Sequence, residues 1–121
     1  LKTIYDNLIK DDFINCYDFY LTSFDIILAG DFFVYIGDLD ALFKKISNLS
    51  KKNTILIFST EKLDKGNYML QLSGRYAHSK KYIYKLLSKY SFKIIDKKDA
   101  MIRKHKSGVV NGEIYLTEYI L

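Results

Sequence analysis

Residues 24–39 of this chain read FDIILAGDFFVYIGDL, and this stretch decides which fold we expect. The apolar run over residues 24–29 has β-propensity and is short enough for a strand that is buried on both faces. Gly30 and Asp31 follow at the carboxyl end of that strand, and a helix is predicted to begin after Asp38. Ligands of open α/β sheets bind at the carboxyl ends of the strands. Gly30 and Asp31 therefore mark the expected position of a binding site.

Strands and helices are predicted to alternate on either side of this stretch. Residues 5–11 read as a short strand, and residues 12–20 as a weak helix or turn. Asp38 is placed to cap a helix with an acidic charge at its positive end. The apolar residues of that helix recur at helical spacing, at Leu39, Leu42, Phe43, Ile46 and Leu49. Asn53 is expected to end it, and residues 54–59 form a second buried strand.

The second half of the chain continues the alternation and ends in a strand pair. A long connection over residues 61–78 leads to Ser79, which caps a further helix. The apolar face of this helix consists of Tyr82, Ile83, Leu86, Leu87 and Tyr90. Residues 92–105 and 110–121 are the last two strands, and turn residues occur where they meet, at Ser107, Gly108, Asn111 and Gly112. We therefore predict an α/β fold and a single domain over residues 1–121.

The composition is typical of a globular domain in a reducing compartment. Hydrophobic residues make up 49% of the chain, which is enough for a core. Because no run of about 18 uncharged apolar residues occurs, we expect no membrane span. Charged residues interrupt the amino-terminal segment, so we expect no signal peptide. The single cysteine, Cys16, excludes an internal disulfide, and we therefore expect a cytoplasmic protein.

The formal net charge of +5 raises the question of nucleic-acid binding. The lysine pairs are scattered along the chain, and arginine, which can grip phosphate with two hydrogen bonds, is scarce. We therefore interpret the positive charge as a solvated surface and consider nucleic acid an unlikely partner. A steep salt dependence of binding would be needed to support that alternative.

Three segments resemble the carboxyl-terminal portion of class I S-adenosylmethionine-dependent methyltransferases. Residues 24–39 are similar to the fourth strand of that family and the loop after it, and residues 54–61 (TILIFSTE) to the fifth strand. Residues 72–79 (LSGRYAHS) resemble the S-G-R-Y-x-H-S segment of bacterial methyltransferases that occur alongside tetratricopeptide repeats. The resemblance implies a partial Rossmann-like methyltransferase sheet with flanking helices. It would contain the family's strands 3, 4 and 5, followed by antiparallel strands 7 and 6.

The chain departs from the family in the part that binds most of the cofactor. Its six glycines form no G-x-G pattern, and the acidic residue that holds the ribose at the end of the second strand has no counterpart. In the family's sheet order 3-2-1-4-5-7-6, strands 1 and 2 would lie between residues 5–11 and 24–29. Without them the strand over residues 24–29 has an open apolar edge, which is an aggregation hazard. We therefore expect a truncated or split methyltransferase; alternatively, residues 5–11 pair with residues 24–29, or a homodimer closes the gap.

The resemblance implies cofactor-binding residues after the third and fourth strands. Asp12 would accept a hydrogen bond from the adenine amino group, and Phe13 would stack on the adenine. The alternative for Asp12 is that it caps the following turn. Gly30, Asp31 and Phe32 would face the methionine end of S-adenosylmethionine and the methyl group that is transferred. The alternative for Asp31 is a turn residue at the end of a strand.

The resemblance also implies residues on the acceptor side. Tyr35, Ser73 and Arg75 would bind the acceptor, with Arg75 as a clamp for a carboxylate or phosphate. Tyr76 and His78 are the catalytic candidates and would orient or deprotonate the nucleophile. The alternative is structural: Arg75 pairs with a surface acid, Tyr76 packs, and His78 precedes a helix cap.

The resulting hypothesis is methyl transfer from S-adenosylmethionine to an unidentified acceptor, for which a small molecule, a protein, a lipid quinone and RNA all remain open. The chain alone is expected to be incomplete for that reaction and inactive. We predict no metal site, because His105 has no second histidine or cysteine pair near it in the sequence. The alternative hypothesis is a non-catalytic, methyltransferase-derived interaction module. Such a module would self-associate or bind a partner by strand addition to its open sheet edge.

Overall fold

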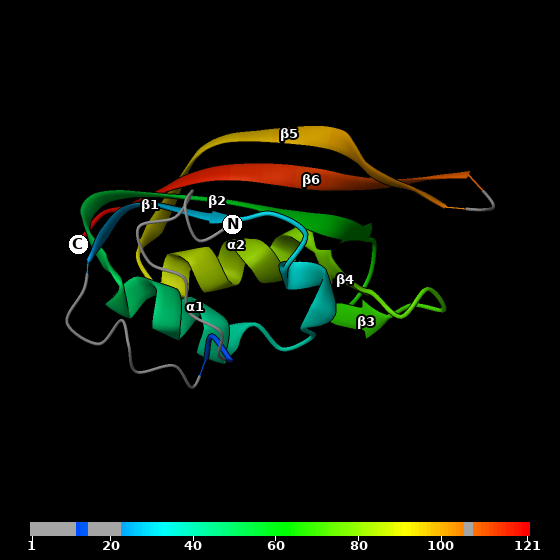
Figure 1. Cartoon of the computed structure of the whole chain (residues 1–121), viewed down its shortest axis with the longest axis horizontal. Coiled ribbons are helices and arrows are strands. Elements are labelled where there is room, and N and C mark those ends of the chain that lie inside the picture. The colour runs from blue at the N-terminus through cyan, green and yellow to red at the C-terminus, as the bar shows by residue number, and fades with distance from the viewer. Residues whose placement is uncertain (1–11, 15–22, 106–107) are drawn as a thin grey trace, which may run out of the picture.

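The chain folds into a mixed β-sheet with two helices packed on one of its faces (Figure 1). The computed structural model describes residues 12–14, 23–105 and 108–121. The predicted strand over residues 5–11 lies outside the described residues, as does most of the predicted helix or turn over residues 12–20. Within the described part of the chain, no helix is long and apolar enough to cross a membrane.

Six strands, two α-helices and one short 3-10 helix make up the described structure. In chain order they are β1 (Phe24–Ala29), η1 (Phe33–Tyr35), α1 (Asp40–Asn48), β2 (Ser50–Leu63), β3 (Tyr68–Leu70), β4 (Tyr76–Ser79), α2 (Lys80–Lys89), β5 (Phe92–His105) and β6 (Gly108–Tyr119).

The strand order of the sheet confirms the predicted α/β fold. β1 runs parallel to β2, β6 runs antiparallel to β2, and β5 is antiparallel to β6. The resulting order β1-β2-β6-β5 is the order expected for the family's strands 4, 5, 7 and 6. β4 continues the sheet by pairing in parallel with residues 61–63 of β2, and β3 is antiparallel to β4.

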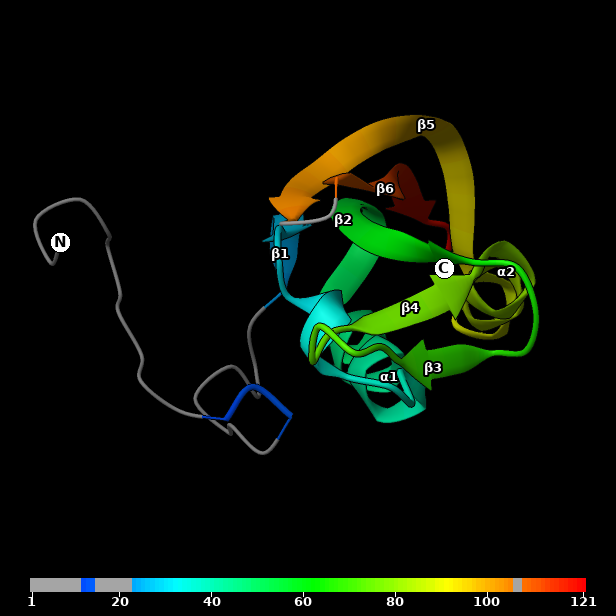
Figure 2. The same ribbon diagram turned by 90° about the vertical axis from the view of Figure 1, so that its right-hand side faces the viewer.

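The small β3–β4 hairpin was not predicted, because residues 61–78 were expected to form a long connection without strands. The hairpin projects from the sheet beside η1 (Figure 2). All three residues of β3 are exposed, so the sequence of this strand has no alternation of buried and exposed positions. Pairing with β4, and not its own apolar pattern, makes this segment a strand.

Two predicted boundaries around α1 were also wrong. The helix begins at Asp40 with Leu39 at the N-cap position, although Asp38 Oδ1 still accepts a hydrogen bond from Asp40 N at 3.0 Å. Leu39 N donates to the hydroxyl of Tyr82 at 2.9 Å, so a distant side chain helps to set this helix start. Asn53 does not end the helix; it lies inside β2, which already begins at Ser50, and has a φ of 75°.

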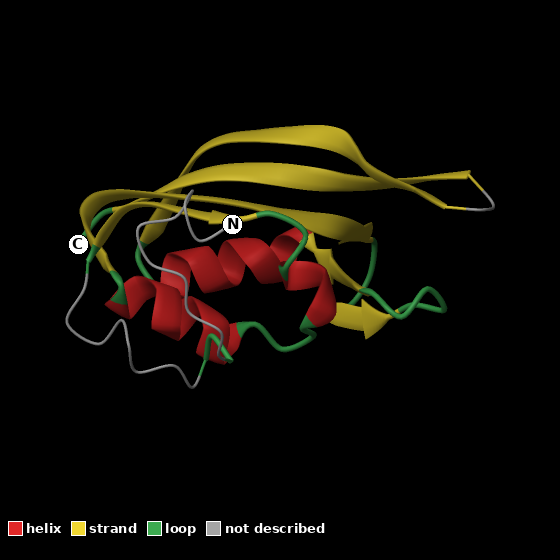
Figure 3. Ribbon diagram, viewed as in Figure 1, coloured by secondary structure: helices red, strands yellow, loops and turns green. Residues whose placement is uncertain are grey.

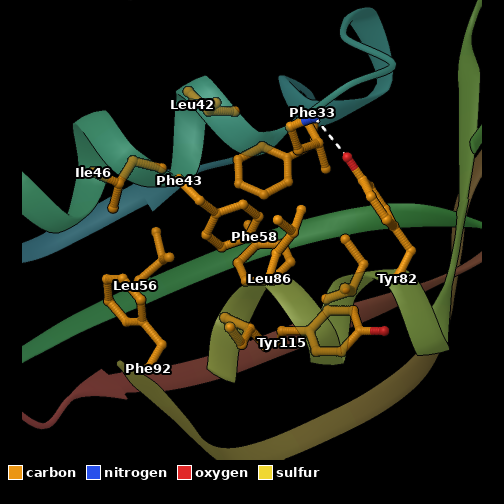
Figure 4. Packing of buried hydrophobic residues seen from close by; sticks show 13 residues of the cluster. Phe33, Leu42, Phe43, Ile46, Leu56, Phe58, Tyr82, Leu86, Phe92 and Tyr115 are labelled. Atoms are coloured by element: carbon orange, nitrogen blue, oxygen red, sulfur yellow. Dashed lines mark hydrogen bonds between the residues drawn. The ribbon is translucent and has the colours of Figure 1, made fainter. Parts of the chain in front are cut away.

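The core lies between the sheet and the two helices, as Figure 4 shows. Phe58 of β2 is stacked between two other rings, with centroids 4.6 Å from Phe33 and 4.8 Å from Tyr115. Phe43 of α1 packs edge-on against Phe58 at 5.7 Å. The predicted apolar faces of both helices point into this core and contribute Leu42, Phe43, Ile46, Ile83, Leu86 and Leu87.

The opposite face of the sheet is covered by neither helix (Figure 3). The prediction that β1 is buried on both faces is therefore wrong for the described structure. Ile26 is 65% exposed and Leu28 is 72% exposed, both on the side away from the core. Among the described strands, β1 pairs with β2 alone, so within the described part of the chain its other edge is open.

Candidate functional site

The loop after β1 is anchored by its buried residues and presents its polar residues to solvent. Phe33 and Val34 of η1 are fully buried. Asp31 and Tyr35, on either side of them, are exposed. Because burial of an aromatic side chain is strongly stabilising, Phe33 holds the loop at the carboxyl end of β1. The loop therefore has a fixed path from which Asp31 and Tyr35 project outward.

An ion pair joins this loop to the β3–β4 hairpin. Arg75 Nη1 donates to Asp31 Oδ1 at 2.6 Å, and the Tyr35 hydroxyl donates to Asp31 Oδ2 at 3.4 Å. The Arg75 Cζ atom lies 5.3 Å from the centre of the Tyr35 ring, which is within cation–π range. The hydrogen bond to Asp31 raises the pKa of Arg75, so the guanidinium stays charged. Three predicted site residues thus meet, although the sequence separates Asp31 and Arg75 by 44 positions.

Ser73 and Tyr76 lie on the same hairpin but make other contacts. Ser73 Oγ accepts a hydrogen bond from Arg75 N at 3.3 Å, which tightens the hairpin turn. Tyr76 is half-buried and packs edge-on against Tyr68 with ring centroids 6.2 Å apart. Both side chains therefore shape the segment that carries Arg75.

His78 is fully buried on β4. Its Nε2 atom lies 2.8 Å from the carbonyl oxygen of Ile36 and 3.1 Å from that of Gly37. Carbonyl oxygens only accept hydrogen bonds, so Nε2 carries the proton and Nδ1 is the unprotonated nitrogen of the neutral ring. Burial lowers the pKa of His78, which favours this neutral form. The ring fastens the loop after β1 to β4 and stacks parallel to Tyr82.

These contacts are the ones that the structural alternative predicts for Arg75, Tyr76 and His78. Arg75 pairs with an acid that is largely exposed, Tyr76 packs against a neighbouring ring, and His78 precedes the Ser79 cap. A role of these residues in binding or activating an acceptor stays a prediction.

On the other side of the loop, two aromatic rings flank an apolar hollow. Phe13 and Phe32 pack edge-on with ring centroids 6.3 Å apart. Both line a hollow of about 350 Å³ along the open edge of β1. Its other lining residues are Ile27, Leu28, Ala29, Gly30, Leu42 and Ile46. The structure thus brings together Phe13, Gly30 and Phe32, which are three of the predicted cofactor-side residues.

Asp12 lies next to this hollow in the chain and is exposed. Its Oδ1 atom accepts a hydrogen bond from Ile14 N at 3.2 Å. That contact is the turn-capping role that was the alternative for Asp12. A role of Asp12 toward adenine stays a prediction.

A second hollow lies on the other side of the Asp31–Arg75 pair and was missed by the sequence analysis. It measures about 410 Å³ and is lined by Asp31, Ser59, Arg75, Met101, Ile102 and Ile114. Ser59 and Ile114 pair directly across β2 and β6. The alternation in these strands could have placed both side chains on the outer face of the sheet. Nothing in the sequence, however, indicates that β5 brings Met101 and Ile102 next to Arg75.

The described residues include no group of three or more histidine, cysteine, aspartate or glutamate side chains that could hold a metal ion.

No protein-family model and no curated protein sequence matches the chain, but its fold is similar to several solved structures. A SAM-dependent methyltransferase from Methanosarcina mazei aligns with a TM-score of 0.72 and 15% identity, over 92% of this chain and 66% of that chain. The [4+2]-cyclase SpnF aligns with a TM-score of 0.71 and 13% identity, over 92% of this chain and 54% of that one. Magnesium protoporphyrin IX methyltransferase from Synechocystis PCC 6803, solved with bound SAH, aligns with a TM-score of 0.65 and 14% identity, over 92% of this chain and 49% of that chain.

These similarities establish the class of fold. The chain has the Rossmann-like fold of class I SAM-dependent methyltransferases, and it spans less than two thirds of the length of each of the three proteins. At 13–15% identity the likeness concerns the fold alone. Since one of the three is a cyclase by name, the fold does not by itself determine the reaction.

Proposed function

We propose that this chain is the carboxyl-terminal part of a truncated or split S-adenosylmethionine-dependent methyltransferase that acts on an unidentified acceptor. One observation carries the proposal: the loop Gly30–Asp31–Phe32 lies at the carboxyl end of β1 in a methyltransferase-like sheet, beside a hollow flanked by two aromatic rings. The subgroup suggested by residues 72–79 and a location in the cytoplasm stay predictions.

The residues present fit one side of the cofactor. The hollow that Phe13 and Phe32 line is apolar and aromatic, which suits an adenine stacked on one of the two rings. A Cβ atom added at Gly30 would meet nothing within 4 Å, so a ligand can approach the backbone there. Asp12 and Phe13 would hold the adenine, and Gly30, Asp31 and Phe32 would hold the methionine end. Because the sequence has no G-x-G pattern, the opposite wall would have to come from another polypeptide segment.

The chain's own residues would bind and orient the acceptor. S-adenosylmethionine, when bound, supplies a methyl group that is already activated, so alignment is the main requirement. Arg75 and Tyr35 hold the Asp31 carboxylate in place at the end of β1. His78 and Tyr76 would act as positioning residues, because His78 ties the loop to β4 and Tyr76 packs beside it.

Titration of the isotope-labelled chain with SAH, followed by NMR, tests the cofactor assignment. We expect selective shifts at the amides of Phe13, Gly30 and Phe32, and binding too weak for calorimetry of the chain alone. Asp12→Asn should weaken these shifts. Asp25→Asn should not, because Asp25 is 84% exposed and pairs with Lys51.

The two parts of the proposal can fail separately in this experiment. If a folded chain shows no selective shifts at millimolar SAH, the cofactor assignment is wrong. If the chain alone binds SAH tightly in calorimetry, the cofactor assignment holds and the proposal that the chain is incomplete is wrong.

A second candidate function is a non-catalytic interaction module. The open edge of β1 and the exposed Ile26 and Leu28 side chains on the uncovered face support it. An open edge with apolar neighbours favours strand addition by a partner or by a second copy. Stable self-association of a chain that does not bind SAH would favour this function over methyl transfer.

A further inference from the structure

We infer that the hollow beside the Asp31–Arg75 pair is the acceptor pocket, and that it selects an uncharged molecule with an apolar body and an O–H or N–H group. This inference rests on the proposed function, since it names the class of acceptor for the same site. The lining of the hollow and the balance of charge within it support this acceptor class.

The hollow has one polar end and one apolar end. Asp31, Ser59 and Arg75 supply the polar end, and Met101 and Ile102 from β5 and Ile114 from β6 supply the apolar one. Its volume of about 410 Å³ is within the range of small-molecule pockets, which is roughly 300–1,000 Å³. A ligand that fills it would place a hydrogen-bonding group near Asp31 and an apolar group against the β5–β6 ribbon.

The charges at the polar end cancel each other. Among the described residues that line the hollow, Asp31 and Arg75 are the only charged ones, and they are hydrogen-bonded at 2.6 Å. A carboxylate ligand would compete with Asp31 for the guanidinium and leave one negative charge without a counterpart. An ammonium ligand would compete with Arg75 in the same way. The Arg75 side chain is 23% exposed and that of Asp31 59% exposed, and a ligand that fills the hollow would displace water from both. A charge that loses its partner under such a ligand is costly, so both kinds of charged ligand are disfavoured.

An uncharged hydroxyl or aromatic amine avoids this cost. A guanidinium has five N–H donors, and a carboxylate has about four acceptor positions. Asp31 already accepts from Arg75 Nη1 and from the Tyr35 hydroxyl, and both the carboxylate and the guanidinium can still make a further hydrogen bond. The ligand can donate its proton toward Asp31 and accept from Arg75 without separating the pair. The nucleophile that is to be methylated would then lie at the carboxyl end of β1.

Three probes of similar size and different charge test this inference without any cofactor. They are naphthol, which is neutral near pH 7, naphthoate, which is an anion, and naphthylmethylamine, which is a cation. NMR titration should show shifts at Met101, Ile102 and Ile114, with naphthol binding at least about tenfold more tightly than either charged probe.

Charge-removing variants should change the order of affinity in a defined direction. Asp31→Asn leaves Arg75 positive and should make naphthoate the preferred probe. Arg75→Gln leaves Asp31 negative and should make the amine the preferred probe. The matched controls are Asp25→Asn and Lys51→Gln, which remove the charges of an ion pair outside the hollow and should leave the order unchanged.

The inference is wrong if the folded chain binds the three probes equally, if Met101, Ile102 and Ile114 do not respond, or if the variants leave the order of affinity unchanged. Its failure is distinguishable from failure of the proposed function. Naphthol binding here without SAH binding would retain the pocket and reject the cofactor assignment. SAH binding without naphthol binding would retain the cofactor assignment and reject the pocket.

Discussion

Gly37 lies where two tyrosine rings pass close to the backbone of the loop after η1. A Cβ atom added there would be 2.7 Å from Tyr76 Cε1 and 2.8 Å from Tyr68 Cδ1, which is closer than real contacts allow. Both rings belong to the aromatic cluster around His78, so neither can move without disturbing other contacts. The glycine thus permits the close approach of the hairpin to the loop that carries Asp31.

We therefore expect Gly37→Ala to lower the free energy of unfolding by about 1–3 kcal/mol, through overpacking. Urea denaturation measures this change. Gly30→Ala is the matched control, because an added Cβ atom at Gly30 meets nothing within 4 Å, and it should change stability by less than about 0.5 kcal/mol. Equal effects of the two substitutions would show that the tyrosine contacts with Gly37 do not matter.

His78 should make the stability of the protein depend on pH. Burial lowers its pKa below the usual 6.5, so between these two values the unfolded chain binds a proton that the folded chain does not bind. This contribution to stability is complete above pH 6.5 and is lost as the pH falls toward the lower folded pKa. The loss approaches about 1.4 kcal/mol per pH unit within that window.

His78→Gln should abolish this part of the pH dependence, since glutamine can donate to the carbonyls of Ile36 and Gly37 but does not titrate. Urea denaturation at a series of pH values measures it. Asp40 does not interfere, because its hydrogen bond to Lys89 lowers its pKa below 3.8 and its contribution is lost only in more acidic solution. Parallel pH profiles of variant and wild type would contradict the assignment of the slope to His78.

Among the elements, α2 is the helix whose beginning is set by its own sequence. Ser79 has extended backbone angles, and its Oγ atom accepts a hydrogen bond from Tyr82 N at 3.1 Å. Ser79→Ala should lower the free energy of unfolding by about 1 kcal/mol, because a first-turn N–H group loses its partner. Ser88→Ala, at an exposed position of the same helix, should leave the free energy of unfolding unchanged or raise it by roughly a few tenths of a kcal/mol. A smaller loss at Ser79 than at Ser88 would mean that the cap is not needed.

At the scale of the whole molecule, the uncovered sheet face and the open edge of β1 should govern association. Ile26→Lys places a charge on that face at a side chain that is already 65% exposed, so it should shift any oligomer toward monomer with little loss of stability. Ile120→Lys, just after β6, is the matched control and should not do so, because Ile120 is 51% exposed and lies beside Leu87 and Ser88 of α2. Sedimentation velocity over a range of protein concentrations measures both. Oligomers that persist equally in both variants would exclude this face as the interface.

The elements with a strong local pattern were predictable from the sequence. β1, β5 and the cap of α2 have the predicted positions, because apolar runs, period-two alternation and a serine before a helical repeat are local signals. The start of α1 was not predictable from the sequence, because the contact of Leu39 N with the Tyr82 hydroxyl joins residues 43 positions apart. The β3–β4 hairpin was missed for a similar reason, since β3 is a strand only through its pairing with β4.

The candidate site was predictable as a list of residues but not as an arrangement. The resemblance named both Asp31 and Arg75, whereas their ion pair depends on how the hairpin folds back onto the loop after β1. Met101, Ile102 and Ile114 carry no signal for a site, because an exposed aliphatic residue in a strand is common. Only the path of the β5–β6 ribbon brings them beside Arg75.

The sequence by itself determined the order of the helices and strands apart from the β3–β4 hairpin, the α/β class and the place of Gly30 and Asp31 after a parallel strand. These features depend on backbone preferences and on the period of apolar residues, which act over a few residues. The tertiary structure decided which side chains meet, which face of β1 is exposed and that His78 is buried and neutral. Those features depend on packing between segments far apart in the chain, where burial and charge pairing outweigh local propensity.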